Sequence, residues 1–380
     1  MTASASRLAG AAFDVVVVGG GPAGAATAIA LAQRGLTAAI VERSAAPFTR
    51  VGETLPPVVR VPLEALRVWE SFAGDGHDPA VGNRSYWGSG QPGEMHFIAT
   101  PYGAGWHIDR CRFETMLLAA AEARGVSLFR GRRVEAVSGG RDGWTVRIPE
   151  TLRARFLVDA SGRASALARL GGVRRVSIDQ LVAATMFLSS RGAQEPADPH
   201  GMFTVIEATP DGWWYSAPLP GRRLVVACMT DADLATRAAL RDVPGWRARA
   251  RSTRATIDRI ASYALDGAPR LSSANTSRLS SVIGPSWLAV GDAAVSLDPL
   301  SSQGIVTALE CAIDAAGAIA HHLAGDPSAL PNYATGITNL YRKYLVERAQ
   351  YYGVERRWRT SLFWQRRQVH LEVRHHATAS

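Results

Sequence analysis

The sequence predicts an α/β protein in which an inserted antiparallel sheet interrupts the nucleotide-binding domain. Residues 13–42 read as strand, glycine-rich turn, helix and strand, and residues 287–323 return to the order strand, turn and helix. Between them, residues 176–230 contain longer segments of alternating hydrophobic and polar character, which are typical of antiparallel strands. With 380 residues, 47% of them hydrophobic, the chain is long enough for about two to three domains.

The expected domains follow these changes of pattern. The nucleotide-binding domain is expected at 10–80, 106–175 and 276–325, the substrate domain at 81–105 and 176–275, and a C-terminal helical region at 326–372. A helix is expected to begin after Asp109, which suits an N-cap, and to end at Gly125. Short strands are then expected at 126–130, 132–138, 143–148 and 154–160.

The N-terminal unit carries the first motif. Gly19, Gly21 and Gly24 form GxGxxG directly after the strand FDVVVV and at the start of the helix PAGAATAIALAQRG. The first Gly permits a tight turn, the second lets a pyrophosphate approach the backbone, and the third lets the helix pack closely on the strand. Glu42 ends the second strand, where a carboxylate can accept hydrogen bonds from an adenosine ribose. The predicted dinucleotide site contains Gly19, Gly21, Pro22, Ala23, Gly24, Glu42 and Arg43.

Two later segments point to a flavin. WLAVGDAAVSLDPLSSQGI at 287–305 is similar to the second flavin motif of glutathione-reductase-like flavoproteins, in which the Asp, here Asp292, binds the ribityl chain. FLVDASGRAS at 156–165 resembles the DG-type segment of flavin monooxygenases. The resemblance covers roughly residues 13–320. It implies FAD bound in the Rossmann-like, p-hydroxybenzoate-hydroxylase-like fold shared by aromatic hydroxylases, geranylgeranyl reductases and tryptophan halogenases.

The resemblance also implies roles for single residues. Arg50, in TRVGETLPP, corresponds to a position beside the flavin pyrophosphate, although an ordinary surface salt bridge is an equal alternative. Arg110 corresponds to the arginine beside the FAD ribose, and Val134 to the strand whose backbone meets the adenine. The isoalloxazine side of the site is expected to contain Pro299, Gln303, Gly304 and Ile305.

An aromatic segment is the candidate substrate wall. GWWYSAPLP at 212–220 resembles a diverged WxWxIP segment of flavin-dependent halogenases, with Tyr215 in place of the second Trp. Trp213 and Tyr215 are therefore candidate catalytic-site residues, and packing in the core of a sheet is the equally weighted alternative. Together with YYGVERRWRTSLFWQRRQ at 351–368, the segment also resembles flavoproteins that oxidise tryptophan side chains within a peptide or protein.

The lysine count argues against halogenation. Flavin halogenases of this group rely on a lysine soon after the Gly-Glu turn to hold or deliver hypohalous acid. Between Glu53 and Arg110 the chain has no lysine, and the single lysine of the sequence is Lys343. Arginine is a poor substitute because its guanidinium stays protonated and cannot form a chloramine.

The expected enzyme is a FAD-dependent monooxygenase that hydroxylates an electron-rich aromatic, a tryptophan or phenol, through a flavin C4a-hydroperoxide formed with O₂. NAD(P)H reduces the flavin directly, or a partner flavin reductase supplies it. The substrate is a small aromatic molecule or a peptide-bound or carrier-bound one. The alternatives are a geranylgeranyl-reductase-like enzyme that reduces C=C bonds, an atypical halogenase and a non-catalytic FAD-binding protein.

Charge and composition bear on partners and location. Residues 341–380 hold nine Arg or Lys against three Glu, so +6 of the net +9 lies there, where it forms either a docking face for an acidic partner or reductase, or a solvated helix. No nucleic-acid motif accompanies the charge. Cys111, Cys228 and Cys311 lie far apart, so no metal site is expected. No secretory signal and no apolar run of spanning length is recognised, and a cytoplasmic location is expected.

Overall fold

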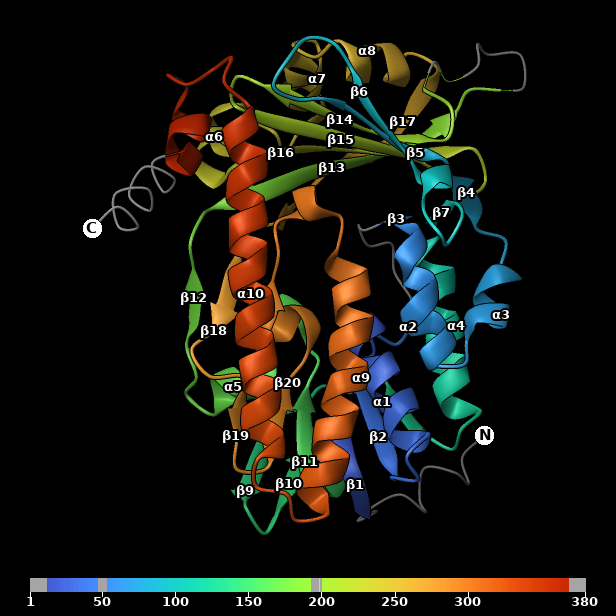
Figure 1. The fold of residues 1–380 in the computed structure, drawn as a ribbon, viewed down its shortest axis with the longest axis vertical. Coiled ribbons are helices and arrows are strands. Elements are labelled where there is room, and N and C mark those ends of the chain that lie inside the picture. The colour runs from blue at the N-terminus through green and yellow to red at the C-terminus, as the bar shows by residue number, and fades with distance from the viewer. Residues whose placement is uncertain (1–11, 47–52, 193–197, 199, 369–380) are drawn as a thin grey trace.

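The computed structural model describes residues 12–46, 53–192, 198 and 200–368. One end of the molecule is built on an eight-stranded sheet with the order β19-β20-β11-β1-β2-β8 and with β9 and β10 attached to β11 (Figure 1). Neighbouring strands from β20 to β8 run parallel. The strands are β1 (Ala12–Val18), β2 (Ala38–Glu42), β8 (Ser127–Arg130), β9 (Ala136–Gly140), β10 (Gly143–Arg147), β11 (Thr151–Asp159), β19 (Ile283–Gly284) and β20 (Trp287–Ala289). The valines of β1 are fully buried at its centre, as a parallel sheet covered on both faces requires.

Three helices pack on one face of this sheet. They are α1 (Pro22–Ala32), α4 (Arg110–Glu122) and α9 (Gly304–Leu323). The Asp109 carboxylate accepts hydrogen bonds from the backbone N–H groups of Cys111 (2.9 Å) and Arg112 (3.1 Å), so the expected N-cap of α4 is confirmed. The small side chains of α1 let it approach both β1 and α9 closely.

Helix α9 corrects one expectation from the sequence. Its 20 residues have a mean hydropathy of 1.3, so by length and composition it could cross a membrane, although no run of spanning length was expected. Its apolar side chains are mostly small, and the face bearing Val306, Leu309, Ala312 and Ile319 is buried in the protein core against α1. The hydropathy of α9 is thus explained by its place in the core.

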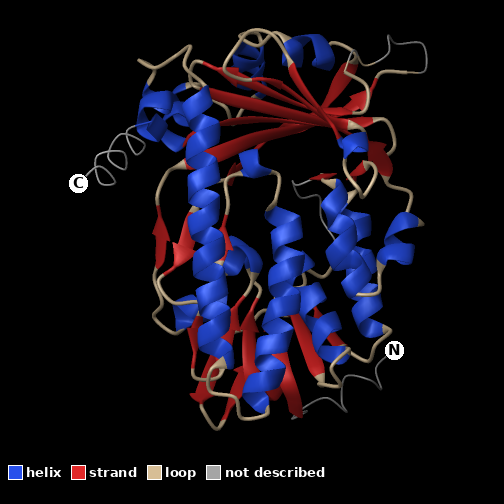
Figure 2. Ribbon diagram, viewed as in Figure 1, coloured by secondary structure: helices blue, strands red, loops and turns tan. Residues whose placement is uncertain are grey.

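The other end of the molecule is a seven-stranded sheet with the order β17-β13-β16-β15-β14-β5-β6 (Figure 2). The strands are β5 (Gly82–Tyr86), β6 (Gly93–His96), β13 (Leu181–Ser190), β14 (Phe203–Thr209), β15 (Gly212–Leu219), β16 (Arg223–Asp231) and β17 (Tyr263–Ser273). All pairs are antiparallel except β14 with β5. Because β5 comes from a distant part of the chain, no hairpin connection dictates its direction.

Short elements connect the two sheets or cover their faces. The helices are α2 (Arg60–Ala65), α3 (Trp69–Ala73), α5 (Ala166–Leu170), α6 (Ala232–Arg237), α7 (Val243–Ala250) and α8 (Ala255–Ile260). One small sheet contains β3 (Thr54–Leu55), β7 (Gly105–His107) and β4 (Asp78–Ala80), and another contains β12 (Arg175–Ser177), β18 (Ser277–Leu279) and β21 (Val295–Ser296). The predicted domain boundaries are not tested by this arrangement and stay a prediction.

The strand expected at 132–138 is displaced. Residues 132–135 are irregular, and β9 begins at Ala136. The Arg132 N–H donates to the carbonyl of Glu42 (3.0 Å), and the Glu135 N–H donates to the carbonyl of Arg147 (2.8 Å), so two residues three positions apart bond to different strands. Val134 therefore lies before the strand in which it was expected.

Helix α10 (Ala329–Val354) runs beside both sheets (Figure 1). Near its start, the Tyr333 hydroxyl donates to the carbonyl of Ala289 in β20 (2.8 Å). Near its end, the Tyr352 ring packs with Trp87, Trp213 and Trp364 under the seven-stranded sheet. One helix thus contacts both the eight-stranded sheet and the seven-stranded sheet.

A buried histidine joins β7 to the seven-stranded sheet. His107 Nε2 lies 2.9 Å from the carbonyl of Met202, which can only accept, so Nε2 carries the proton. Nδ1 then accepts from Thr54 Oγ1 at 3.3 Å. Burial lowers the pKa of His107 from 6.5 to about 4, because a cation here would lose its hydration.

His107 makes the free energy of unfolding depend on pH in the acidic range. The folded-state pKa is lower than the unfolded one, so its contribution is complete above pH 6.5 and is lost as the pH falls towards 4. From this group we expect the free energy of unfolding to fall by on the order of 3 kcal/mol over that interval. Urea unfolding at several pH values should show a weaker acid dependence for His107→Gln than for the parent. Equal slopes for the parent and His107→Gln would contradict this.

Candidate functional site

The glycine-rich turn is so tight that side chains cannot be added to it. Gly19 has φ +110°, and a Cβ on it would lie 2.3 Å from the carbonyl oxygen of Ala160. A Cβ on Gly24 would lie 1.9 Å from the carbonyl oxygen of Gly19. Gly21 is the N-cap of α1 with Pro22 next to it, and no side chain caps the helix. The first-turn amides of α1 are thus available to phosphate oxygens, which fits a dinucleotide.

Glu42 is oriented at the end of β2. One carboxylate oxygen accepts from the N–H of Gly20 (2.7 Å) and the other from the N–H of Ser44 (2.8 Å). Each oxygen keeps a further lone pair for a ribose hydroxyl. Arg43, which follows, is exposed. The Glu42 carboxylate can therefore still accept hydrogen bonds from a ribose, as predicted.

The three sequence motifs meet at the start of α1. Gly291 has φ +54°, and a Cβ on it would lie 2.8 Å from the Cβ of Ala23. From the middle motif, Ala160 reaches Gly19 as described above. The turn after Ala160 is fixed by Asp159, whose carboxylate accepts from the N–H groups of Ser161 (3.1 Å) and Ala168 (2.9 Å). Segments more than a hundred residues apart thus form one site.

Asp292 presents its carboxylate outward from the third motif. Its side chain is 45% exposed, and Oδ2 lies 3.5 Å from Nε of Arg163. Its carbonyl accepts from the Ser296 hydroxyl (2.9 Å) and from the guanidinium of Arg175. The backbone is therefore held while the carboxylate can reach a ligand, which fits the ribityl role implied by the resemblance.

The expected isoalloxazine side lies at the start of α9. Pro299, Gln303 and Gly304 are exposed, and Ile305 is partly buried against the core. Ser302 has φ +52°, and this left-handed residue turns the chain into α9. No side chain caps α9, so its first amides face outward and could stabilise negative charge on a reduced flavin.

Asp298, just before this turn, is bound by one face of α10. Its carboxylate accepts from the Tyr352 hydroxyl (2.7 Å) and lies 3.5 Å from Nε of Arg348. Its N–H donates to the Tyr344 hydroxyl (2.9 Å), and its other oxygen accepts from the N–H of Leu300 (3.0 Å). Burial raises the pKa of Asp298, while Arg348 opposes this. Tyr344, Arg348 and Tyr352 were missed in the sequence, although their spacing of four residues places polar side chains on one helical face.

The aromatic segment faces the nucleotide-binding half. Trp213 is only 1% exposed, and its Nε1 donates to the Tyr352 hydroxyl (3.1 Å). Tyr215 is partly buried, and its hydroxyl lies 2.9 Å from Thr54 Oγ1. Both pack on the sheet face that also contacts Leu300. Because Thr54 donates to His107, the Tyr215 hydroxyl donates to Thr54, and burial raises its pKa. Tyr215 therefore keeps its proton at neutral pH and cannot serve as a base.

Arg110, Val134 and Arg50 are the other three residues predicted to bind FAD. Arg110 begins α4, and its Nη2 is 2.5 Å from Oε1 of Glu114, with both side chains nearly buried. Val134 is partly buried and packs beneath the sheet, outside any strand. Arg50 lies outside the described residues. The ligand roles of all these residues stay predictions.

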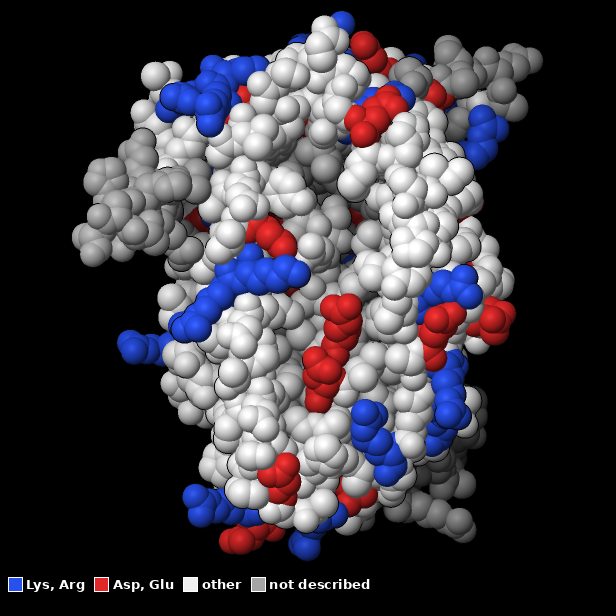
Figure 3. All heavy atoms as spheres, in the orientation of Figure 1, with Lys and Arg blue, Asp and Glu red and all other residues white. Residues whose placement is uncertain are grey.

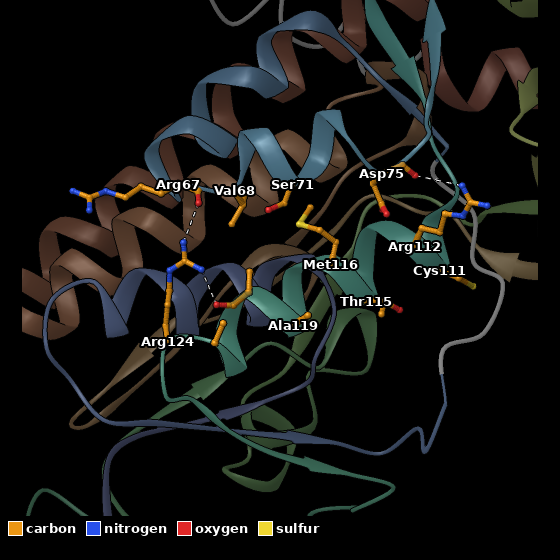
Figure 4. Close-up of a pocket in the computed structure, with 12 residues that line it drawn as sticks. Arg67, Val68, Ser71, Asp75, Cys111, Arg112, Thr115, Met116, Ala119 and Arg124 are labelled. Atoms are coloured by element: carbon orange, nitrogen blue, oxygen red, sulfur yellow. Dashed lines mark hydrogen bonds between the residues drawn. The ribbon is translucent and has the colours of Figure 1, made fainter.

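A groove of about 720 Å³ lies between α3 and α4, away from the three motifs (Figure 4). Two of its three arginines, Arg112 and Arg124, are used by the protein itself. Arg124 donates to the carbonyls of Ala120 (2.7 Å) and Arg67 (2.9 Å), and Arg112 donates to the carbonyl of Asp75 (3.3 Å). These bonds satisfy carbonyls in and around the helices, so the groove is not assigned to the flavin.

Comparison with known proteins agrees with the site. Residues 12–348 match the family model described as FAD binding domain, and the chain belongs to this family. It is a flavin-dependent oxidoreductase of the monooxygenase and halogenase superfamily. It is 31% identical over 374 residues to a putative FAD-dependent oxidoreductase, LodB, of Marinomonas mediterranea, covering 96% of this chain and 99% of that one. It is 26% identical to a tryptophan 2-halogenase of Chondromyces crocatus, covering 93% and 70%.

Solved structures share the fold. The myxobacterial chondrochloren halogenase CndH superposes with a TM-score of 0.83 at 26% identity, covering 94% of this chain and 86% of that one. The peptidyl tryptophan dihydroxylase QhpG superposes with a TM-score of 0.70 at 26% identity, covering 94% and 79%. The expected fold class is confirmed.

We expect Asp292→Ala to weaken FAD binding by about 1–3 kcal/mol, the cost of removing one partner of a buried hydrogen bond. Titration of the apoprotein with FAD, followed by flavin fluorescence, measures this. Asp258→Ala in α8, on the outer side of the substrate sheet, should bind FAD like the parent. Unchanged affinity in Asp292→Ala would remove this residue from the site.

We expect Tyr352→Phe to lower the free energy of unfolding by about 1–3 kcal/mol, because Asp298 and the Trp213 N–H each lose a buried partner. The neighbouring Tyr351, which is 52% exposed, provides the matched control Tyr351→Phe. Urea unfolding of both variants makes the comparison. Equal stability of the two would show that the Asp298 contacts contribute nothing.

Proposed function

We propose that the protein is a FAD-dependent monooxygenase that hydroxylates an electron-rich aromatic side chain, a tryptophan within a peptide or protein. The observation that carries the proposal is the absence of a lysine from the site. The single lysine of the sequence, Lys343, lies on α10 with its side chain 79% exposed and Nζ 3.9 Å from Glu347 Oε1. A free amine to hold hypohalous acid is therefore missing from the substrate side.

The described residues suit oxygen transfer in a dry pocket. When bound, reduced FAD supplies the chemistry that activates O₂ for transfer of one oxygen atom. The wall of Tyr215 and Leu300, with Trp213 buried behind it, is apolar except for a tyrosine hydroxyl that already donates to Thr54. Such a wall offers little to retain water, and water exclusion protects reactive oxygen species from side reactions. The amides at the start of α9 provide the polar side of the pocket.

The proposed substrate class comes from the similar proteins. QhpG is described as a peptidyl tryptophan dihydroxylase, and two relatives are halogenases of pyrrole held on a peptidyl carrier protein. A macromolecule-borne aromatic is thus a recurrent substrate on this fold. Electrons come from NAD(P)H directly or from a partner flavin reductase, since the described residues contain one GxGxxG turn. A cytoplasmic location is consistent with that supply.

Halogenation is the second candidate, because several relatives are halogenases. A reaction mixture of a tryptophan-containing peptide, FAD, NADH, a flavin reductase and ¹⁸O₂ separates the candidates by product mass. We expect one or more ¹⁸O atoms in the peptide, no bromine isotope doublet in the presence of bromide, and no change in Lys343→Met. A bromine doublet without ¹⁸O in the peptide would replace oxygenation with halogenation, and its loss in Lys343→Met would assign that reaction to this lysine. Peptide reduction without O₂ would favour a C=C reductase.

A further inference from the structure

We propose that the groove between β12 and α10 binds an extended, acidic segment of the protein substrate, which adds as a strand to the free edge of β12. This inference rests on the proposed function only in the identity of the partner. The groove has a volume of about 420 Å³ and is lined on one side by Val176 and Ile178, and on the other by Tyr341 and Leu345 of α10.

The edge of β12 offers backbone groups. In the described part of the chain, β12 is the outermost strand of its sheet and pairs only with β18. The Ser280 N–H donates to the carbonyl of Arg174, and the Ile178 N–H donates to the carbonyl of Thr276, so residues 174, 176 and 178 direct their backbone towards β18. Because successive residues of a strand alternate, the N–H and C=O groups of Arg175 and Ser177 face the other side. An extended peptide can pair with them.

The side chains beside this edge are apolar and exposed. Val176 is 50% and Ile178 is 40% exposed, although β-branched aliphatic residues are usually buried. Both project from the same face of the ribbon as Arg278, whose register partner is Val176. A peptide with alternating aliphatic residues would cover this surface.

The charge of the groove selects an acidic occupant. Arg278 and Arg342 line it, and among its described lining residues none is acidic. Arg278 also lies over the ring of Tyr341, at 5.4 Å from the centroid. Two carboxylates close in sequence to the lining residues are already paired, Asp179 with Arg348 at 2.9 Å and Glu347 with Lys343 at 3.9 Å. Figure 3 shows basic side chains crossing this side of the molecule at the level of β12 and α10.

The same strand contacts the flavin motif on its inner side. The Arg175 guanidinium donates to the carbonyls of Asp292 and Ala293 and to the Ser296 hydroxyl (3.1 Å). A segment bound at the outer edge of β12 would therefore pair with a strand whose Arg175 side chain contacts the Asp292 turn. Docking here would hold a long substrate next to the flavin-binding half while its aromatic residue enters the site.

The test uses fluorescein-labelled ten-residue peptides and fluorescence anisotropy with the FAD-loaded full chain. A peptide whose groove-facing residues are Val and Glu in turn, separated by Ser, should bind, because residues two apart in a strand share one face. The same peptide with Lys in place of Glu should bind at least about tenfold more weakly, because like charges repel. Arg278→Glu and Arg342→Glu should each weaken binding of the Glu peptide by about tenfold. The adjacent Lys343→Glu, which does not line the groove, is the matched control and should leave it unchanged.

A Glu peptide that is N-methylated at its Ser residues tests the strand pairing, because it keeps its charge and loses the backbone donors that would face β12 in an antiparallel pair. Its binding should be lost. No binding of the Glu peptide, equal binding of the N-methyl peptide, or an equal loss in Lys343→Glu would each overturn the proposal. Since the probe peptides contain no aromatic residue, their binding does not depend on the oxidation reaction, so failure here and failure of the proposed function are distinguishable.

Discussion

The hydrogen bonds and the ion pair between α10 and Asp298 are the interactions on which the arrangement of the site depends. Asp298 is 1% exposed, and an isolated carboxylate at such a position would be costly. This cost is offset by polar contacts from one face of α10, made by Tyr344, Arg348 and Tyr352. Because Asp298 also caps the turn that begins at Pro299, the start of α9 is positioned by α10, the helix that follows α9 in the chain.

The same helix couples the two halves of the protein. Tyr352 donates to Asp298 and accepts from Trp213, so one hydroxyl joins the flavin-side turn to the substrate sheet. A second connection runs from His107 through Thr54 to Tyr215. Polar networks buried in this way specify one relative placement of packed elements, because a displaced partner leaves a donor or acceptor unsatisfied. The placement of the two sheets is thus set by hydrogen bonds as well as by apolar packing.

These contacts change how the aromatic segment is understood. Trp213 was a candidate wall residue with core packing as the alternative, and its burial against Tyr352 places it largely within the core. Tyr215 is more exposed than Trp213, but its hydroxyl donates its proton to Thr54 in a hydrogen bond. The chemistry of the proposed oxygen transfer therefore depends on the bound flavin and on exclusion of water, while these side chains provide shape. A large substrate would obtain its binding energy elsewhere, as at the edge of β12.

The sequence by itself determined the nucleotide-binding unit. GxGxxG, Asp109 as a helix N-cap and the apolar helix after Gly304 are local patterns, because turn geometry, capping and helical spacing depend on near neighbours. The sequence also shows directly that no lysine lies between Glu53 and Arg110. Only the tertiary structure decided that Ala160 contacts Gly19, that β5 pairs in parallel with β14, that Val134 precedes its strand, and that Tyr352 reaches Asp298. These depend on contacts between residues far apart in the chain, for which a single sequence carries no local signal.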